Sequence, residues 1–110
     1  MPNSHDDQLK VLLLNDRGPW VAICLNYDLA AQGDSSTKAL EALNWTYWAQ
    51  VQLDLQKGIA PFTSCETSPR MYWERFDGGL RFAASFEFKP PFQIDHGEPP
   101  SVPEDVRLAA

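Results

Sequence analysis

The chain has 110 residues, of which 44% are hydrophobic and 22% charged, and its formal net charge is −6. This length suits one domain, and the composition is that of a soluble globular protein. The acidic balance disfavours nonspecific contact with nucleic-acid phosphates and suits a basic protein partner, although many proteins carry such a charge for solubility alone. Cys24 and Cys65 are too few for a disulfide framework or a structural metal site, so we expect two reduced cysteines.

Neither targeting nor membrane insertion is indicated. The N-terminus, Met1 to Gln8, is polar and acidic, unlike a signal peptide. No apolar run approaches the length of a membrane span. We expect a disordered N-terminus over residues 1–8, one domain over residues 9–89, and a proline-rich tail over residues 90–110. The protein is expected to be cytoplasmic and to make no membrane contact.

Three short segments near the N-terminus predict β-strands. Leu9–Asn15 and Trp20–Leu25 are apolar runs separated by turn-forming residues, which favours an antiparallel hairpin. Leu29–Gln32 predicts either a third strand or a bulged continuation of the second. Because the first two segments are apolar on both faces, we expect a sheet that is covered on one side and partly covered on the other.

A long helix is predicted from Ser36 to Lys57. Gly33 can end the extended segment because it tolerates positive φ, and Asp34 or Ser35 can then cap the helix. Gly58 is a suitable C-terminal stop. At 3.6 residues per turn, the apolar residues expected on the core face are Ala39, Leu40, Leu43, Tyr47 and Val51.

The predicted helix is apolar around most of its circumference, a pattern typical of a helix that lies between two surfaces. Trp48 extends the apolar arc on one flank, whereas Trp45 falls opposite the core face, among polar residues. Two interpretations of Trp45 stay open. A later loop or the C-terminal tail covers it, or it anchors a contact with a second protein molecule, since tryptophans recur as interface hot spots.

The C-terminal half predicts a short helix and one clear strand. Ser68 and Pro69 suit the N-cap and the first position of a helix over Pro69–Phe76. Leu80–Lys89 alternates with a period of two, as a half-buried antiparallel strand does. We expect its buried face to carry Leu80, Phe82, Ala84, Phe86 and Phe88, and its outward face Arg81, Ala83, Ser85, Glu87 and Lys89. Val106–Leu108, within the proline-rich tail, can form a terminal strand.

No motif of enzyme chemistry stands out. His5 and His96 do not stand at metal-ligand spacing, and no nucleophile motif or phosphate-binding glycine loop is found. Aromatic and basic residues between positions 70 and 89 are interrupted by acidic ones, unlike a nucleic-acid surface. The carboxylates considered for two-metal hydrolysis, whose predicted positions do not converge, are Asp16, Asp28, Asp34 and Glu41. We therefore expect no enzyme activity, no cofactor and no metal.

One segment carries a family resemblance. In Trp20–Leu43 a strand leads through Q-G-D-S into a helix, and this segment resembles the N-terminal domain of HicB-like antitoxins. Pro69–Phe76 (P-R-M-Y-W-E-R-F) and the ending V-R-L-A-A are similar to single-domain members of that group. Lys38 stands where the family has a capping-box glutamate, so Ser35 must cap alone. The residues after Lys89 hold too many prolines for the C-terminal DNA-binding motif of many members, which makes DNA binding doubtful.

The resemblance implies an α+β fold: a curled antiparallel sheet of three to four strands, backed by one long helix and one short helix. Such a domain is related to a truncated ribonuclease H-like core. Family members bind a small basic ribonuclease toxin, HicA, cover its active site and commonly self-associate.

Our hypothesis is therefore a non-enzymatic module that self-associates and inhibits or sequesters a partner protein. The default partner is a HicA-type ribonuclease toxin, or a component of a bacterial or phage defence system. The residues expected to contact the partner are Trp45, Trp48, Arg81, Ser85 and Glu87. Two alternatives stay open: a metal-dependent nuclease or single-stranded nucleic-acid binder on the same core, and a structural subunit of a larger assembly.

Overall fold

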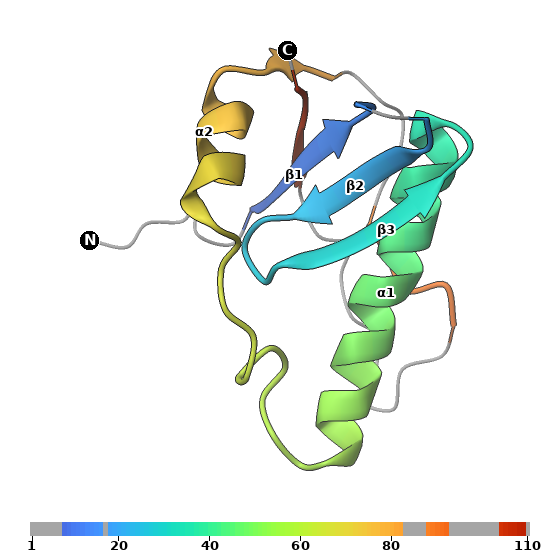
Figure 1. Cartoon of the computed structure of the whole chain (residues 1–110). Helices are drawn as coiled ribbons and strands as arrows, with labels where there is room; N and C mark the ends of the chain where they lie inside the picture. Colours follow the sequence, from blue (N-terminus) through green and yellow to red (C-terminus); the bar gives the residue numbers. More distant parts are fainter. Residues whose placement is uncertain (1–7, 17, 83–87, 93–103, 110) are drawn as a thin grey trace.

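The computed structural model describes residues 8–16, 18–82, 88–92 and 104–109. Within these residues the protein is of the α+β class, with a five-stranded sheet of order β3-β2-β1-β5-β4 and two helices (Figure 1). The elements, in chain order, are β1 (Leu9–Leu14), β2 (Trp20–Cys24), β3 (Leu29–Gly33), α1 (Ser36–Gln56), α2 (Arg70–Asp77), β4 (Leu80–Arg81) and β5 (Glu104–Leu108).

The first three strands form an antiparallel meander. β1 pairs with β2, with Leu12 opposite Ile23. β2 pairs with β3, with Ala22 opposite Ala31. The predicted hairpin is therefore confirmed, and the segment after it is a separate third strand.

The C-terminal strand corrects the predicted sheet. β5 lies parallel to β1, with Val106 opposite Val11, and antiparallel to β4, with Leu108 opposite Leu80. The sheet is mixed and, over the described residues, has five strands, where we expected three to four antiparallel ones. The strand expected at Val106–Leu108 is present. Its neighbours were not predicted, because a short local pattern specifies a strand but not the strand it pairs with.

Alternation along β1 divides the interior into two apolar cores, one on each face of the sheet. Val11 and Leu13 belong to the core beneath α1, whereas Leu12 and Leu14 belong to the core beneath α2. The residues that spacing assigned to the core face of α1 are all buried: Ala39, Leu40, Leu43, Tyr47 and Val51. The α2 core is smaller, and Phe76 is the buried residue of that helix. The expected cover on both faces is confirmed.

A close junction sets α1 against the end of β3. Ser35 caps the helix, since its Oγ accepts the backbone N–H of Lys38 at 3.1 Å. A Cβ on Gly33 would lie 2.6 Å from the backbone nitrogen of Ala39. Only glycine fits at that distance, so Gly33 brings the strand directly onto the first helical turn. The prediction that Ser35 is the capping residue is confirmed, and Lys38 contributes only its backbone N–H to the cap.

The predicted start of the short helix is wrong. Ser68 does not cap α2, and its hydroxyl donates to Asp28 Oδ1 at 2.7 Å. Pro69 stands at the N-cap and supplies no side-chain cap, so α2 begins at Arg70. Asp28 lies in the turn between β2 and β3, which sequence spacing alone does not bring near Ser68.

The strand expected over Leu80–Lys89 appears as the two residues of β4, and residues 83–87 lie outside the described part of the chain. Leu80, assigned to the buried face, is 64% exposed, because β4 is the last strand in the sheet order and starts there. Phe88, assigned to the same face, is fully buried as expected.

Candidate protein-binding surface

The face of α1 that points away from the sheet carries two large exposed apolar side chains. Trp45 is 55% exposed and Leu53 is 50% exposed, and Ala49 between them is also exposed. A spacing of four residues places all three along one line of the helix surface. With Glu41 and Lys57 at its ends, this line is called the α1 ridge below. Contiguous exposed apolar side chains of this size are typical of contact sites.

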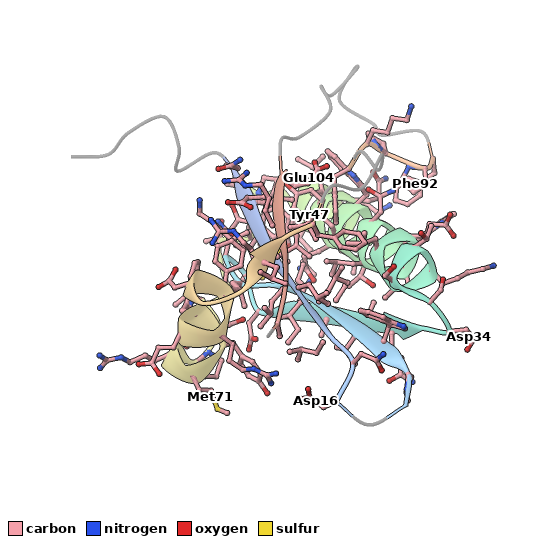
Figure 2. All side chains as sticks on the ribbon, turned by 90° about the horizontal axis from the view of Figure 1, so that it is seen from above. Asp16, Asp34, Tyr47, Met71, Phe92 and Glu104 are labelled. Atoms are coloured by element: carbon pink, nitrogen blue, oxygen red, sulfur yellow. The ribbon has the colours of Figure 1, made fainter. Side chains whose placement is uncertain are left out.

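The ridge has a fixed position because the other side of α1 is packed into the core. Asn44 adds a polar tie: its Nδ2 donates to the Lys89 carbonyl at 3.0 Å, and its Oδ1 accepts the Lys89 N–H at 3.1 Å. This pair of hydrogen bonds holds residues 88–92 alongside α1, where Figure 2 shows Phe92. The Phe92 ring centroid lies 5.4 Å from that of Trp45. A later segment therefore contacts Trp45 but leaves about half of it exposed.

Trp48, the second predicted contact residue on α1, lies in the core. It is 4% exposed, and its ring packs edge-on against Tyr47 with 4.9 Å between centroids. Its indole N–H is buried with no hydrogen-bond partner among the described residues. A side chain this buried offers a partner almost no surface, so the candidate surface rests on Trp45 and Leu53.

Of the other three predicted contacts, one lies in the described part of the chain, at the far end of the sheet order. Arg81 is on β4, is largely exposed, and has its guanidinium 3.9 Å from Asp105. Ser85 and Glu87 fall outside the described residues. Of the five predicted contact residues, Trp45 and Arg81 are therefore the two that the described structure places at the surface, on different elements.

Sequence reasoning missed a buried charge pair on β5. Asp105 is buried, and Arg107 donates to both of its carboxylate oxygens at 3.2 Å. The Arg107 guanidinium also lies 4.6 Å from the centre of the Phe76 ring on α2. The pair therefore fastens the C-terminal strand to α2. The sequence did contain a signal for this pair: Asp105 and Arg107 are two residues apart, and residues at that spacing in a strand share one face.

A second buried carboxylate holds the loop that follows α1. Asp54 accepts hydrogen bonds from Gln50 Nε2 at 3.1 Å and from the Phe62 backbone N–H at 2.8 Å. Phe62 has a positive φ of 67° and stacks on Tyr27 at 4.0 Å between centroids. Asp54 thus stabilises a strained turn, and its role is structural.

The carboxylates considered for metal binding do not gather. Asp16 accepts two hydrogen bonds from Arg75, at 3.0 and 3.2 Å, and Asp28 accepts one from Ser68. Asp34 lies at the start of α1, well away from Asp16 in Figure 2, and Glu41 is exposed on α1. In the part of the chain that the structure describes, no three His, Cys, Asp or Glu residues are arranged to hold a metal ion.

The two cysteines are free thiols, and neither is activated. Burial raises the pKa of the Cys24 thiol to about 11. The pKa of Cys65 is also raised, chiefly by burial and further by the charge of Asp54. A raised pKa disfavours the thiolate, which is the nucleophilic form.

These features define a mixed-sheet α+β domain with an exposed apolar ridge on its long helix. No protein-family model, curated protein or solved structure matches the chain. Neither helix in the described ranges is long and apolar enough to cross a membrane.

Proposed function

We propose that this chain is a non-enzymatic protein-binding module that self-associates and inhibits or sequesters a partner protein. The observation that carries the proposal is the α1 ridge, where Trp45 and Leu53 stay half-exposed on a helix whose opposite side is fixed in the core. Burying apolar surface contributes about 25 cal/mol per Å². A rigidly held tryptophan is the side chain most often found at the energetic centre of an interface.

The partner is, by default, a HicA-type ribonuclease toxin, or else a component of a bacterial or phage defence system. The net charge of −6 supports a basic partner. The likeness of Trp20–Leu43 to HicB-like antitoxins supports the toxin. A truncated ribonuclease H-like core is part of the same proposal. It draws support from an antiparallel β1–β3 meander followed by a long helix and a later strand parallel to β1. Such a module acts in the cytoplasm, where the toxin's RNA substrates are.

Inhibition of a HicA-type ribonuclease tests the proposal. The toxin's cleavage of labelled RNA is measured against increasing amounts of the protein, and complex formation is followed by size-exclusion chromatography. The wild-type chain is expected to suppress cleavage at a fixed stoichiometry. Trp45→Asp is expected to weaken inhibition about 30-fold, the effect of losing a hot spot of 2 kcal/mol. The same loss of inhibition is expected whether the ridge contacts the toxin directly or forms the self-associated state that inhibits it.

Met71→Asp is the matched control. Met71 is 59% exposed on α2, and Figure 2 shows it on the other side of the molecule from Phe92. This variant removes a similar exposed side chain and adds the same charge, so inhibition is expected to persist. Equal inhibition by wild type and Trp45→Asp, or none by either, contradicts the proposal. Circular dichroism of Trp45→Asp excludes unfolding as the cause of any loss.

Two other functions are separated by simple measurements. A metal-dependent nuclease or single-stranded nucleic-acid binder cleaves labelled RNA or DNA with Mg²⁺ or Mn²⁺, or binds it tightly in a salt-sensitive manner. A structural subunit forms a larger assembly, which light scattering detects. We expect neither cleavage nor tight binding, and either result overturns the inhibitor proposal.

A further inference from the structure

The α1 ridge has a two-sided chemical pattern centred on Ala49. Trp45 and Leu53 stand four residues to either side of Ala49, and Glu41 and Lys57 stand eight residues to either side. All five side chains are exposed. Among the described residues neither Glu41 nor Lys57 takes part in an ion pair. The ridge therefore has an acid at one end, a base at the other, and apolar side chains between them.

We propose that the α1 ridge binds the α1 ridge of a second copy of this chain, in an antiparallel dimer with its two-fold axis at Ala49. The proposal rests on the self-association included in the proposed function and specifies the surface that carries it. A two-fold axis at Ala49 sets Trp45 against the second copy's Leu53, and Glu41 against its Lys57. Residues four apart form one of the two ridges by which helices pack, and pairs of such ridges cross at about −50°. A two-fold interface is self-complementary in this manner.

Charge complementarity is what identifies a second copy as the occupant. In the antiparallel arrangement both ends of the interface gain a Glu–Lys pair, and the two helix dipoles oppose each other favourably. A parallel arrangement instead places Glu41 beside Glu41 and Lys57 beside Lys57, which repel. Ala49 at the centre is small enough for the two helices to approach closely. Lys38 is a further exposed charge near the start of α1, outside the ridge.

Charge reversal with purified chains tests the dimer, and sedimentation equilibrium measures its dissociation constant. Glu41→Lys and Lys57→Glu each place like charges opposite one another at both ends, so each variant alone is expected to dissociate about tenfold more readily. An equimolar mixture of the two variants restores opposite charges at both ends. The mixture, and the double variant E41K/K57E, are therefore expected to regain the wild-type dissociation constant. Glu66→Lys, an exposed charge reversal outside the ridge, serves as the control and leaves the constant unchanged.

Trp45→Asp is expected to be a folded monomer, with its fold checked by circular dichroism. A wild-type chain that sediments as a monomer at several hundred micromolar overturns the dimer. So does a dimer that neither charge reversal weakens, or a mixture that stays as dissociated as its components. These measurements use the chain alone, whereas the proposed function is read from ribonuclease inhibition. A toxin-inhibiting monomer refutes the dimer and the self-association but leaves the inhibitor function standing, whereas a dimer that inhibits no ribonuclease refutes the inhibitor function only.

Discussion

The two helices cover opposite faces of one sheet but are held in different ways (Figure 1). α1 has 21 residues, a side-chain cap from Ser35, and a full stripe of buried apolar residues. α2 has eight residues, no side-chain cap, and one buried residue, Phe76. A helix as short as α2 is not stable by itself in water, so it depends on ties to its surroundings.

Polar contacts supply those ties to α2. Arg75 pairs with Asp16 in the turn after β1, and the Trp73 indole N–H donates to Thr67 Oγ1 at 2.9 Å. Arg107 on β5 contacts the Phe76 ring and donates to the Phe76 carbonyl at 3.4 Å. The α1 side therefore depends on shape and burial, whereas the α2 side depends in part on charge. The two sides should therefore respond to different perturbations.

The largest effect is expected at the junction of β3 and α1. Gly33→Ala places a Cβ 2.6 Å from the Ala39 nitrogen and 2.7 Å from the Lys38 carbonyl carbon. Both are backbone atoms that move only with the helix, so we expect the free energy of unfolding to fall by about 3 kcal/mol. Gly78→Ala, at the end of α2, is the control, since its added Cβ meets no atom closer than 3.7 Å. Urea denaturation compares the two variants, and equal losses contradict a tight junction.

The next effect is a loss of stability in alkali that originates on the α1 side. Burial raises the pKa of Cys24 to about 11, from an ordinary value near 9. Between these values the unfolded chain releases the thiol proton and the folded chain keeps it, so unfolding becomes easier as pH rises. The stabilisation is complete below about pH 9 and falls by up to about 2.5 kcal/mol by pH 11.

Urea denaturation at pH 8, 9, 10 and 11 measures this decline, and Cys24→Ala is the comparison. The variant starts less stable, because it removes buried atoms, but its stability should fall less steeply between pH 9 and 11. A second decline begins above pH 10 in both proteins, since burial also raises the pKa of Tyr47. Parallel pH profiles for the two proteins would falsify the assignment to Cys24.

Much of the α1 side could be predicted because its signals are local. The Gly33–Ser35 junction, the buried stripe of α1 and the outward position of Trp45 follow from spacing and capping chemistry within about 20 residues of chain. These features are decided by one helix and the strand before it. The structure agrees with the Ser35 cap, the buried stripe and the outward Trp45. Gly33 differs, because its φ is not positive and a glycine is required there by the close approach of Ala39.

The features that could not be predicted depend on contacts between distant segments. The place of β5 beside β1 joins residues about 95 positions apart. The burial of Trp48 depends on what packs against the flank of α1, where spacing alone leaves both outcomes open. The Asp105–Arg107 pair reaches Phe76 because β5 lies beneath α2, a placement that local sequence does not predict. Pairing between distant segments is thus the main reason why the structure differs from the sequence-based predictions, and most of these differences lie in the C-terminal half.

The smallest effect concerns the ion pair that ties α2 to the β1–β2 turn. Arg75 and Asp16 are both substantially exposed, and hydrogen bonding to Asp16 raises the pKa of Arg75, which stays charged at any working pH. We expect a double-mutant cycle with Arg75→Ala and Asp16→Asn to give a coupling of about 0.5 kcal/mol at low salt. In 0.5 M NaCl the coupling should largely vanish, because the Debye length is then only about 4 Å. The loss in Gly33→Ala, which arises from backbone overlap, should be the same at both salt concentrations. If the Arg75–Asp16 coupling instead survives in salt, the pair acts through its fixed hydrogen-bond geometry, and α2 is held to the sheet as rigidly as α1.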